Sequence, residues 1–380
     1  MLGRVTAQSP MRPSSLLTSD GWPYLLVPFI PLAVVLDLVG AGAVAIFTVS
    51  ALGVIPTAAM MGRATEELAA RSGPGIGGLL NVTFGNAPEL IIALFALEAG
   101  LHEVVKASIV GSIIGNVLLV LGASMIAGGA RRRGEIQQFN RSAASSQASM
   151  LLLATVAVIM PAVYVMVDAN GLPSPTAELT NFTPEVEHLS LITAIVLIGA
   201  YLAGLLFSLR THSNLFNLEE GEELAEDAWS VKRSVTMLAI AGALVAVMSE
   251  ILVGSISETA EKAGISEFFI GAIVVAIVGN AAEHWVAVLV ARKGKMNLAV
   301  NISIGSSAQV ALFVAPVLVL ASYLIGPGPM PLVFNGFELG ALVLAALIAN
   351  QITSDGESTW FKGVQMIAVY VIIAVAFYVA

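Results

Sequence analysis

The chain has 380 residues, of which 57% are hydrophobic and only 11% are charged, and its formal net charge is −9 at pH 7. Because soluble domains carry roughly 25% charged residues, this composition predicts an all-α integral membrane protein. There are no cysteines and only four histidines. This excludes disulfides, iron–sulfur clusters and thiolate metal sites, and it argues against a multi-histidine zinc site.

Eleven apolar stretches follow one another along the chain. A helix needs about 20 mostly apolar residues to cross a bilayer, and the sequence predicts such helices at 22–40, 43–62, 75–97, 104–129, 145–167, 188–209, 231–255, 266–291, 297–323, 329–352 and 360–380. The boundary between the first two is the weakest, because only Gly40-Ala41-Gly42 separates them. The first 20 residues show no cleavable signal and are expected to form a cytosolic tail.

The basic residues divide unequally between the two sides of these predicted helices. Fifteen Lys and Arg residues fall on the side of the N-terminus, and only Lys106 and Lys262 fall on the other. Since cytoplasmic loops carry the excess of positive charge, we expect the N-terminus in the cytoplasm and the C-terminus outside. A short chain without a targeting segment indicates a prokaryotic plasma membrane, although a vacuolar homologue would look similar.

A short motif occurs twice: Gly85 to Leu90 reads GNAPEL, and Gly279 to His284 reads GNAAEH. At a fixed offset of 194 residues, segments 76–120 and 270–314 match at twelve of forty-five positions without a gap. Each segment is expected to be a helical hairpin. Corresponding spans of the two hairpins lie five spans apart along the chain, an odd number, so they cross the membrane in opposite directions. This is the inverted repeat typical of secondary transporters.

The repeat predicts how the chain is divided. Residues 1–42 form the tail and an extra helix, and 43–210 form a first five-helix repeat with its motif in 75–129. Residues 211–230 form an acidic cytosolic segment, and 231–380 form the second five-helix repeat with its motif in 266–323.

Each motif places a carboxylate inside an apolar span, where an unpaired charge is costly. Asn86 and Glu89 are three residues apart, as are Asn280 and Glu283, so each pair shares one face of its helix. Two carboxylates and two amide oxygens form an oxygen-rich ligand set, which hard cations and above all Ca²⁺ prefer.

The backbone is expected to contribute further oxygens. Gly85 and Gly279 weaken their helices, and Pro88 adds to this in the first copy. The second copy has Ala282 in its place, so any break at Gly279 should be milder. Backbone carbonyls freed at the two glycines would join the cation site.

The second arm of each hairpin carries uncharged polar residues. Ser112 and Ser306 match in the repeat, and Asn116 and Gln309 lie one position apart in the alignment. They are interpreted as further ligands or as groups that orient the glutamates, with tight helix packing as the alternative. His284 either relays protons and tunes Glu283 or is a hydrogen-bonded interior histidine.

Two carboxylates held close together in a dehydrated site favour their protonated forms, because desolvation and mutual repulsion both oppose ionisation. Glu89 and Glu283 would then hold protons until a divalent cation displaces them. The sequence thus predicts exchange of Ca²⁺ for protons without any cofactor.

The two segments GNAPELIIALFAL with GSIIGNVLLVLG, and GNAAEHWVAVLVARKGKMNLAVNISIGSSAQVALFVAP, resemble the α-repeats of the Ca²⁺/H⁺ antiporters in the cation/Ca²⁺ exchanger superfamily. The resemblance covers essentially the whole chain. It implies that Glu89 and Glu283 are the central Ca²⁺ and proton ligands, with Asn86, Asn280 and Gln309 close by. It also implies that protons moving down their gradient expel Ca²⁺ from the cytosol. The chain departs from the family pattern at Gly115, where a serine is usual.

Most of the other acidic residues singled out in the sequence have two interpretations each. Glu66 and Glu67 form either a solvated helix end or a cation-attracting mouth, and Glu250 and Glu338 either line an exit path or pair with a neighbouring helix. Asp37 is expected at the membrane interface. The acidic stretch from Glu219 to Asp227 is either a solvated loop helix or a segment that attracts or senses Ca²⁺.

Other functions would require other residues. A Na⁺/Ca²⁺ exchanger on the same fold would need more carboxylate and hydroxyl ligands, and a Mn²⁺ or Mg²⁺ antiporter uses the same oxygen ligands. An intramembrane protease would need a motif such as H-E-x-x-H, which is absent from the sequence, and a channel would not couple flux to a counter-gradient. The expected partners are Ca²⁺, protons and the lipid bilayer. No nucleic-acid partner is expected, and a homo-oligomer remains open.

Overall fold

The computed structural model describes residues 21–131, 136–168, 171–175, 182–211 and 229–380. The tail of the first 20 residues and the acidic stretch from Glu219 to Asp227 lie outside these ranges. The helices are η1 (Trp22–Leu26), α2 (Phe29–Leu38), α3 (Ala43–Arg71), α4 (Gly73–Gly85), α5 (Ala87–Glu98), α6 (His102–Ile114), α7 (Leu121–Arg131), α8 (Arg141–Asp168), α9 (Pro184–Leu206), α11 (Val231–Gly254), α12 (Ile256–Ala263), α13 (Glu267–Phe269), α14 (Ala276–Arg292), α15 (Met296–Val300), α16 (Ser306–Gln309), α17 (Ala315–Ala321), α18 (Gly336–Thr353) and α19 (Trp360–Val379).

Turns of π-helix interrupt several of these elements. They are η2 (Gly115–Val120), η3 (Phe207–Thr211), η4 (Ile270–Val275), η5 (Asn301–Gly305) and η6 (Val310–Val314). Two of them, η2 and η6, fall at equivalent places of the repeat. Such turns are frequent at functional sites, and the sequence did not predict them. The all-α expectation has one small exception, an antiparallel pair of two-residue strands, β1 (Gln137–Gln138) and β2 (Glu357–Ser358).

Among the described residues, nine helices are long and apolar enough to cross a membrane, or ten if the bent pair α4 and α5 counts as one span. These ten correspond to the second to eleventh predicted stretches. The first predicted stretch, 22–40, forms only a shorter apolar helix, Trp22–Leu38. Length and composition therefore support ten of the eleven expected crossings, and the eleventh stays a prediction.

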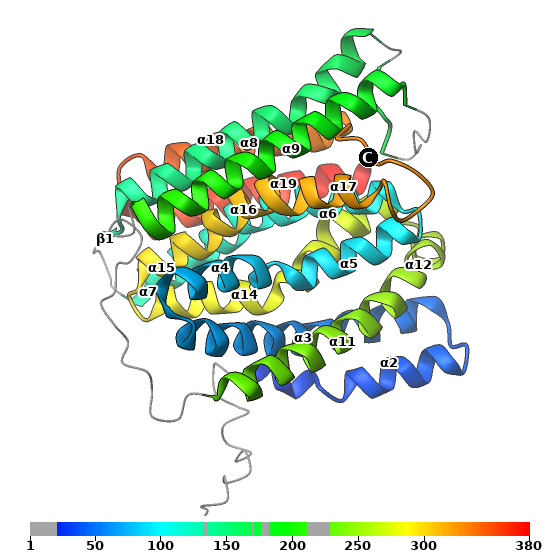
Figure 1. The fold of residues 1–380 in the computed structure, drawn as a ribbon, viewed down its shortest axis with the longest axis horizontal. Coiled ribbons are helices and arrows are strands. Elements are labelled where there is room, and N and C mark those ends of the chain that lie inside the picture. Colours follow the sequence, from blue (N-terminus) through cyan, green and yellow to red (C-terminus); the bar gives the residue numbers. More distant parts are fainter. Residues whose placement is uncertain (1–20, 132–135, 169–170, 176–181, 212–228) are drawn as a thin grey trace, which may run out of the picture.

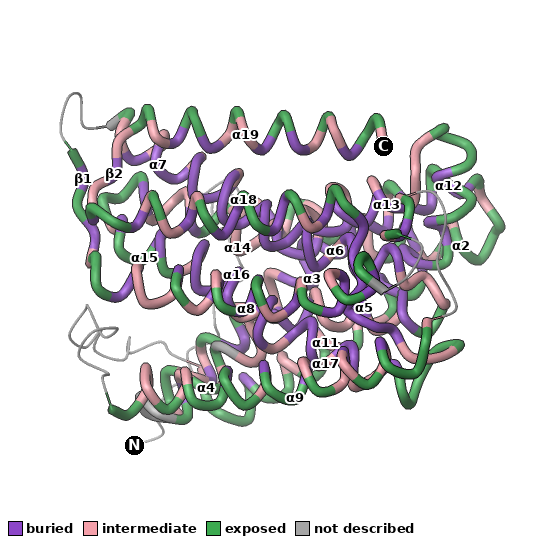
Figure 2. Tube along the Cα trace, turned by 90° about the horizontal axis from the view of Figure 1, so that it is seen from above, coloured by how far each residue is buried: buried purple, intermediate pink, exposed green. Residues whose placement is uncertain are grey.

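The helices run roughly side by side in layers (Figure 1). In that view α8, α9 and α18 lie along one edge, and α2, α3 and α11 lie along the opposite edge. The helices α4, α5, α6, α14 and α16, which come from the two motif hairpins, lie between them. The repeat thus forms the centre of the molecule. Figure 2 shows the consequence for burial, since buried segments gather along α6 and its neighbours while α19 at the rim alternates between buried and exposed.

The turns of the two hairpins have the same backbone conformation. Gly100 joins α5 to α6 with a φ of 77°, and its repeat partner Gly294 joins α14 to α15 with a φ of 87°. Both values lie in the left-handed region, which glycine enters without strain. The matched glycines of the sequence are therefore explained by equivalent tight turns.

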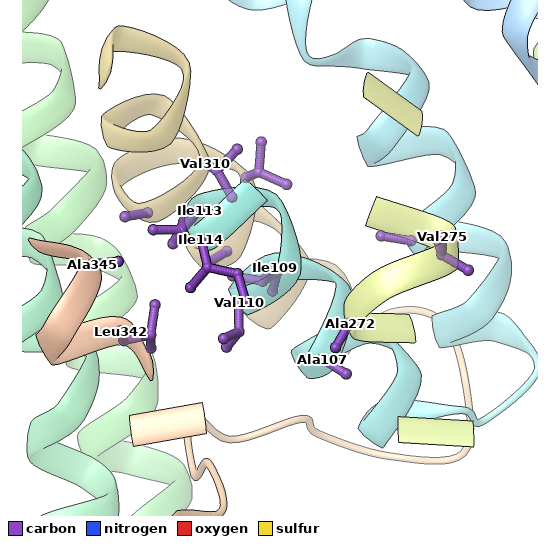
Figure 3. Packing of buried hydrophobic residues seen from close by; sticks show 14 of the residues in the cluster. Ala107, Ile109, Val110, Ile113, Ile114, Ala272, Val275, Val310, Leu342 and Ala345 are labelled. Carbon is purple, nitrogen blue, oxygen red and sulfur yellow. The ribbon is translucent and has the colours of Figure 1, made fainter. Parts of the chain in front are cut away.

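The core is densest around α6. Of its residues from Glu103 onward, only Ser108 is not buried. Ile109, Val110 and Ile113 lie among apolar side chains of the neighbouring helices (Figure 3). On another side, Gly111 approaches the backbone of η4 so closely that an added Cβ would lie 1.9 Å from the carbonyl oxygen of Ala272. This close approach holds the first hairpin against the second.

Candidate cation site

The first motif is a helix break. α4 ends at Gly85 and α5 begins at Ala87, and the two axes differ by 42°. Pro88 lies in the first turn of α5, where its missing N–H has no partner to lose. The break places Glu89 in the same first turn, near the positive end of the helix dipole. Glycine and proline therefore start a new helix that presents the carboxylate.

The second motif is not broken. α14 runs continuously from Ala276 to Arg292 through Gly279, so the milder break that the sequence suggested is not present. The reason is the fourth residue of the motif. It is Pro88 in the first copy, and in the second copy it is Ala282, which keeps the N–H that proline lacks. An unbroken helix leaves no backbone carbonyl free in its interior, and Gly279 contributes space rather than a freed oxygen.

That space is used in both copies. A Cβ on Gly85 would lie 3.4 Å from Oε1 of Glu283, and a Cβ on Gly279 would lie 3.4 Å from Cγ of Glu89. Each motif glycine therefore faces the glutamate of the other motif. The absence of a side chain lets the two crossing helices and their carboxylates come together.

Glu89 lies in a hydrogen-bond network that spans both motifs. Ser112 donates to Glu89 Oε1 at 2.5 Å, and the Asn280 amide donates to the same oxygen. Asn280 Nδ2 also lies 3.1 Å from Ser112 Oγ and 3.0 Å from the carbonyl of Ala276. Glu89 Oε2 is buried and has no hydrogen-bond partner among the described residues. One oxygen of this carboxyl is therefore unsatisfied, as expected where a proton or a cation binds.

Glu283 lies in the matching network of the other half. Ser306 lies 3.4 Å from Glu283 Oε2 and 3.2 Å from Asn86 Oδ1, and it can donate to either. Asn86 in turn donates to Gln309 Oε1 at 2.6 Å. Each glutamate thus contacts the serine 23 residues after it, and each serine contacts the asparagine of the other motif. The pattern of hydrogen bonds follows the repeat of the sequence.

Asn116 and His284 extend the network on one side only. The ring Nε2 of His284 lies 3.0 Å from Asn116 Oδ1, and Asn116 Nδ2 lies 3.4 Å from Ser306 Oγ. Because the Asn116 amide nitrogen is directed to Ser306, its oxygen accepts from the imidazole N–H. His284 therefore reaches Glu283 through Asn116 and Ser306. Asn116 was the site residue least evident from the repeat, since its counterpart is the apolar Val310.

The donor set suits a hard cation carried as cargo. The described residues hold no group of three or more His, Cys, Asp or Glu that could bind a metal ion, so neutral oxygens would have to complete a cation site around the two glutamates. Asn86, Asn280, Ser112 and Ser306 are between 2% and 7% exposed, while both glutamates are partly exposed. Carboxylate, amide and hydroxyl oxygens are ligands that Ca²⁺ accepts in flexible geometry.

Acidic residues away from this site have other surroundings. Glu67 Oε2 accepts from the backbone N–H of Trp229 at 2.8 Å, and Arg71 donates to the carbonyl of Trp229. The Trp229 ring lies against the guanidinium groups of Arg63 and Arg233. These contacts join the end of α3 to the start of α11. Of the other acidic residues singled out in the sequence, Glu66, Glu250 and Asp37 are exposed and Glu338 is fully buried.

This geometry can be compared with known proteins. A family model described as sodium/calcium exchanger protein matches residues 42–210 and 233–379, which include both hairpins. The chain belongs to the sodium/calcium exchanger protein family. Two relatives are similar to this chain along nearly their whole length. A Ca²⁺/H⁺ antiporter of Synechocystis sp. is 43% identical, covering 93% of this chain and 96% of that protein.

Two further members support the same placement. The Ca²⁺/H⁺ antiporter ChaA of Bacillus subtilis is 44% identical, covering 93% of this chain and 97% of that protein. The solved structure of native YfkE matches with a TM-score of 0.79 at 39% identity, covering 94% of this chain and 100% of that one. In this exchanger, then, the expected helical transporter architecture is present, and relatives at this level are named for Ca²⁺/H⁺ antiport.

Proposed function

We propose that this protein is a secondary active antiporter that exports Ca²⁺ from the cytosol in exchange for protons. The observation that carries the proposal is the meeting of Glu89 and Glu283 at the crossing of the two motifs. Each glutamate lies beside the glycine of the other motif, and each is held by a serine that also contacts the asparagine of the other motif. Relatives named Ca²⁺/H⁺ antiporter support the choice of ions. The protein is a transporter of the membrane, and its bacterial relatives support a prokaryotic plasma membrane.

The exchange follows from charge balance at the two carboxylates. Bound between two ionised carboxylates, Ca²⁺ leaves the site neutral, and two protonated carboxyls leave it neutral as well. Both the Ca²⁺-bound and the doubly protonated state avoid the cost of an unpaired charge within the membrane. Ser112 and Asn280 hold Glu89, and Ser306 holds Glu283, so the same carboxylate oxygens bind either Ca²⁺ or the protons. The neutral oxygens of Asn86, Asn280 and Gln309 complete the proposed Ca²⁺ ligand set.

The repeat offers a route to alternating access. We propose two five-helix halves, 43–210 and 231–380, with the motifs in 75–129 and 266–323, joined by the acidic segment 211–230 and preceded by 1–42. The equivalent hairpin turns and matched hydrogen bonds support this division. Inverted halves that rock against each other expose a midplane site to one side at a time.

A Na⁺/Ca²⁺ exchanger is the main rival, because the family as a whole is named for sodium. A site with only two carboxylates and neutral oxygens favours protons over Na⁺, since each proton binds to one carboxylate oxygen and needs no coordination shell of its own. Ca²⁺ uptake into vesicles driven by a pH gradient tests this directly. Uptake driven by a Na⁺ gradient but not by a pH gradient would contradict the proposal.

Loss of Gln309 is expected to weaken the site moderately. In Gln309→Ala, Asn86 Nδ2 loses the acceptor 2.6 Å away, and a buried hydrogen bond is worth about 1 kcal/mol. The Ca²⁺ concentration for half-maximal uptake should therefore rise several-fold, with the maximal rate less affected. Gln351→Ala, at an exposed position of α18, is the matched control and should leave both parameters unchanged.

The proposed orientation of the second half, with the loop after α17 outside and the loop after α18 in the cytoplasm, can be tested with single cysteines because the chain has none of its own. Leu324→Cys, at a site 88% exposed after α17, should react with a membrane-impermeant thiol reagent added outside intact cells. Ser354→Cys, exposed after α18, should react only after the membrane is opened. The reverse pattern would invert the topology.

A further inference from the structure

A second group of ionisable side chains is buried at the beginning of α6, away from the central site. Lys106 and Glu103 form an ion pair, with only 2% and 9% of their side chains exposed. Glu338 near the start of α18 is 0% exposed. Its surroundings include both members of the pair, since Glu338 interacts electrostatically with Lys106 and with Glu103. The central exchange makes no use of these residues.

The hydrogen bonds of the group are only partly complete. Lys106 Nζ donates to Glu103 Oε1 and, at 3.0 Å, to the carbonyl of Val333. Glu338 Oε2 accepts from the backbone N–H of Asn335 at 2.8 Å, which completes a capping box at the start of α18. The other oxygen of each glutamate, Glu103 Oε2 and Glu338 Oε1, is buried without a partner among the described residues. The Asn335 Nδ2 amide is likewise buried without a partner.

The charges of the group do not cancel. Two carboxylates and one ammonium leave a net negative charge among side chains that are at most 9% exposed, and such burial strongly opposes full ionisation. Other ionisable groups on the elements packed against α6 and α18 do not supply a second buried cation. These other groups are His102 of α6; the central-site Glu89 and the exposed Glu98 of α5; the part-exposed Glu267 of α13; Glu283, His284 and the end residue Arg292 of α14; Arg141, Tyr164 and Asp168 of α8; and Lys362, Tyr370 and Tyr378 of α19.

We infer that Glu103 and Glu338 share one bound proton beside Lys106, and that the protein therefore has a second proton-binding site separate from its central glutamate pair. The proton neutralises the group and turns one of the unsatisfied oxygens into a donor. Glu103 precedes Ser112 by nine residues on one helix, so the two sites lie about 13 Å apart along α6 at 1.5 Å per residue. In the proposed orientation this second site lies near the outer face, from which the protons enter.

The proton also bears on the outer contacts of the fold. Lys106 joins α6 to the segment between α17 and α18 through the Val333 carbonyl, and Glu338 caps α18. With the proton bound, Lys106 has a single carboxylate to balance and stays in this contact. The site assignment rests on the described contacts alone, and only its placement at the outer face rests on the proposed function.

Infrared spectroscopy of the purified full-length protein tests the inference, because a protonated carboxyl has its own C=O stretching band. The background is the Glu89→Gln, Glu283→Gln double variant, which lacks the central carboxyls. At neutral pH it should keep a protonated-carboxyl band. Adding Glu338→Gln should remove that band, and adding Glu103→Gln instead should remove it too, since the remaining carboxylate then pairs with Lys106. A band that survives either substitution would overturn the shared proton.

Two controls keep the result decisive. Glu258→Gln in the same background removes a carboxylate whose side chain is 59% exposed and which is paired with Lys262 at 2.5 Å, and it should leave the band unchanged. In Glu338→Gln the side chain still accepts from the backbone N–H of Asn335, so the capping box and the thermal unfolding temperature should be retained.

Ca²⁺ should diminish the protonated-carboxyl band of the wild-type protein but not that of the double variant. A wild-type band that ignores Ca²⁺ would count against the proposed function and leave the second site to be judged by the Glu103 and Glu338 variants.

Discussion

Glu89→Gln is expected to abolish Ca²⁺ uptake driven by a pH gradient. The substitution keeps the shape of the side chain but removes one of the two charges that neutralise Ca²⁺, together with the group that carries a proton. Breaking a buried charge pair costs about 3–5 kcal/mol, which is more than about a hundredfold in affinity. Glu283→Gln should behave in the same way, because Glu283 occupies the equivalent place in the other half.

The measurement is Ca²⁺ uptake into vesicles that contain the purified protein, with an imposed pH gradient. Glu258→Gln, which changes an exposed carboxylate paired with Lys262, serves as the control for charge and should retain full activity. Near-normal uptake by Glu89→Gln in correctly folded protein would remove this residue from the transport site. Binding of Ca²⁺ to the detergent-solubilised variant, followed by calorimetry, separates lost binding from lost movement.

Gly111→Ala is expected to be the most damaging small substitution in the fold. Its Cβ would lie 1.9 Å from the oxygen and 2.6 Å from the carbon of the Ala272 carbonyl, and 2.8 Å from Cβ of Ala276. These atoms are backbone or are fixed directly to it, so no flexible side chain can move aside. Overpacking in a well-packed core costs about 1–3 kcal/mol and occasionally more. Here α6 and η4 must separate, so the cost should lie at the upper end.

Gly115→Ala provides the matched control on the same stretch of chain. Apart from its chain neighbours and the backbone of its own helix, no atom lies within 4 Å of the position its Cβ would take, so the folded protein should accept it. We expect a lower yield and a lower unfolding temperature in detergent for Gly111→Ala, and values close to wild type for Gly115→Ala. Equal stability of the two variants would show that the close approach of α6 to η4 is not required.

The sequence alone determined the class of the protein and pointed to the residues proposed for its central site. The scarcity of charge can only be satisfied in a bilayer, and a buried Gly-Asn-x-x-Glu that recurs in a gapless repeat indicates a site shared by two halves. The hairpin turns also follow the repeat, because Gly100 and Gly294 occupy matched positions and both have a left-handed backbone. These features are local or periodic, so they can be read without knowledge of which helices touch.

Only the tertiary structure decided how the two motifs meet. The sequence predicted that Gly279 weakens its helix, but Gly279 lies inside an unbroken α14 and makes room for Glu89. The partner of Asn86 is Gln309, 223 residues away, and the neighbours of Glu338 are Glu103 and Lys106 on α6. Such pairings depend on packing between distant helices. A sequence pattern reports which face of a helix is polar, whereas the folded arrangement determines which other helix that face meets.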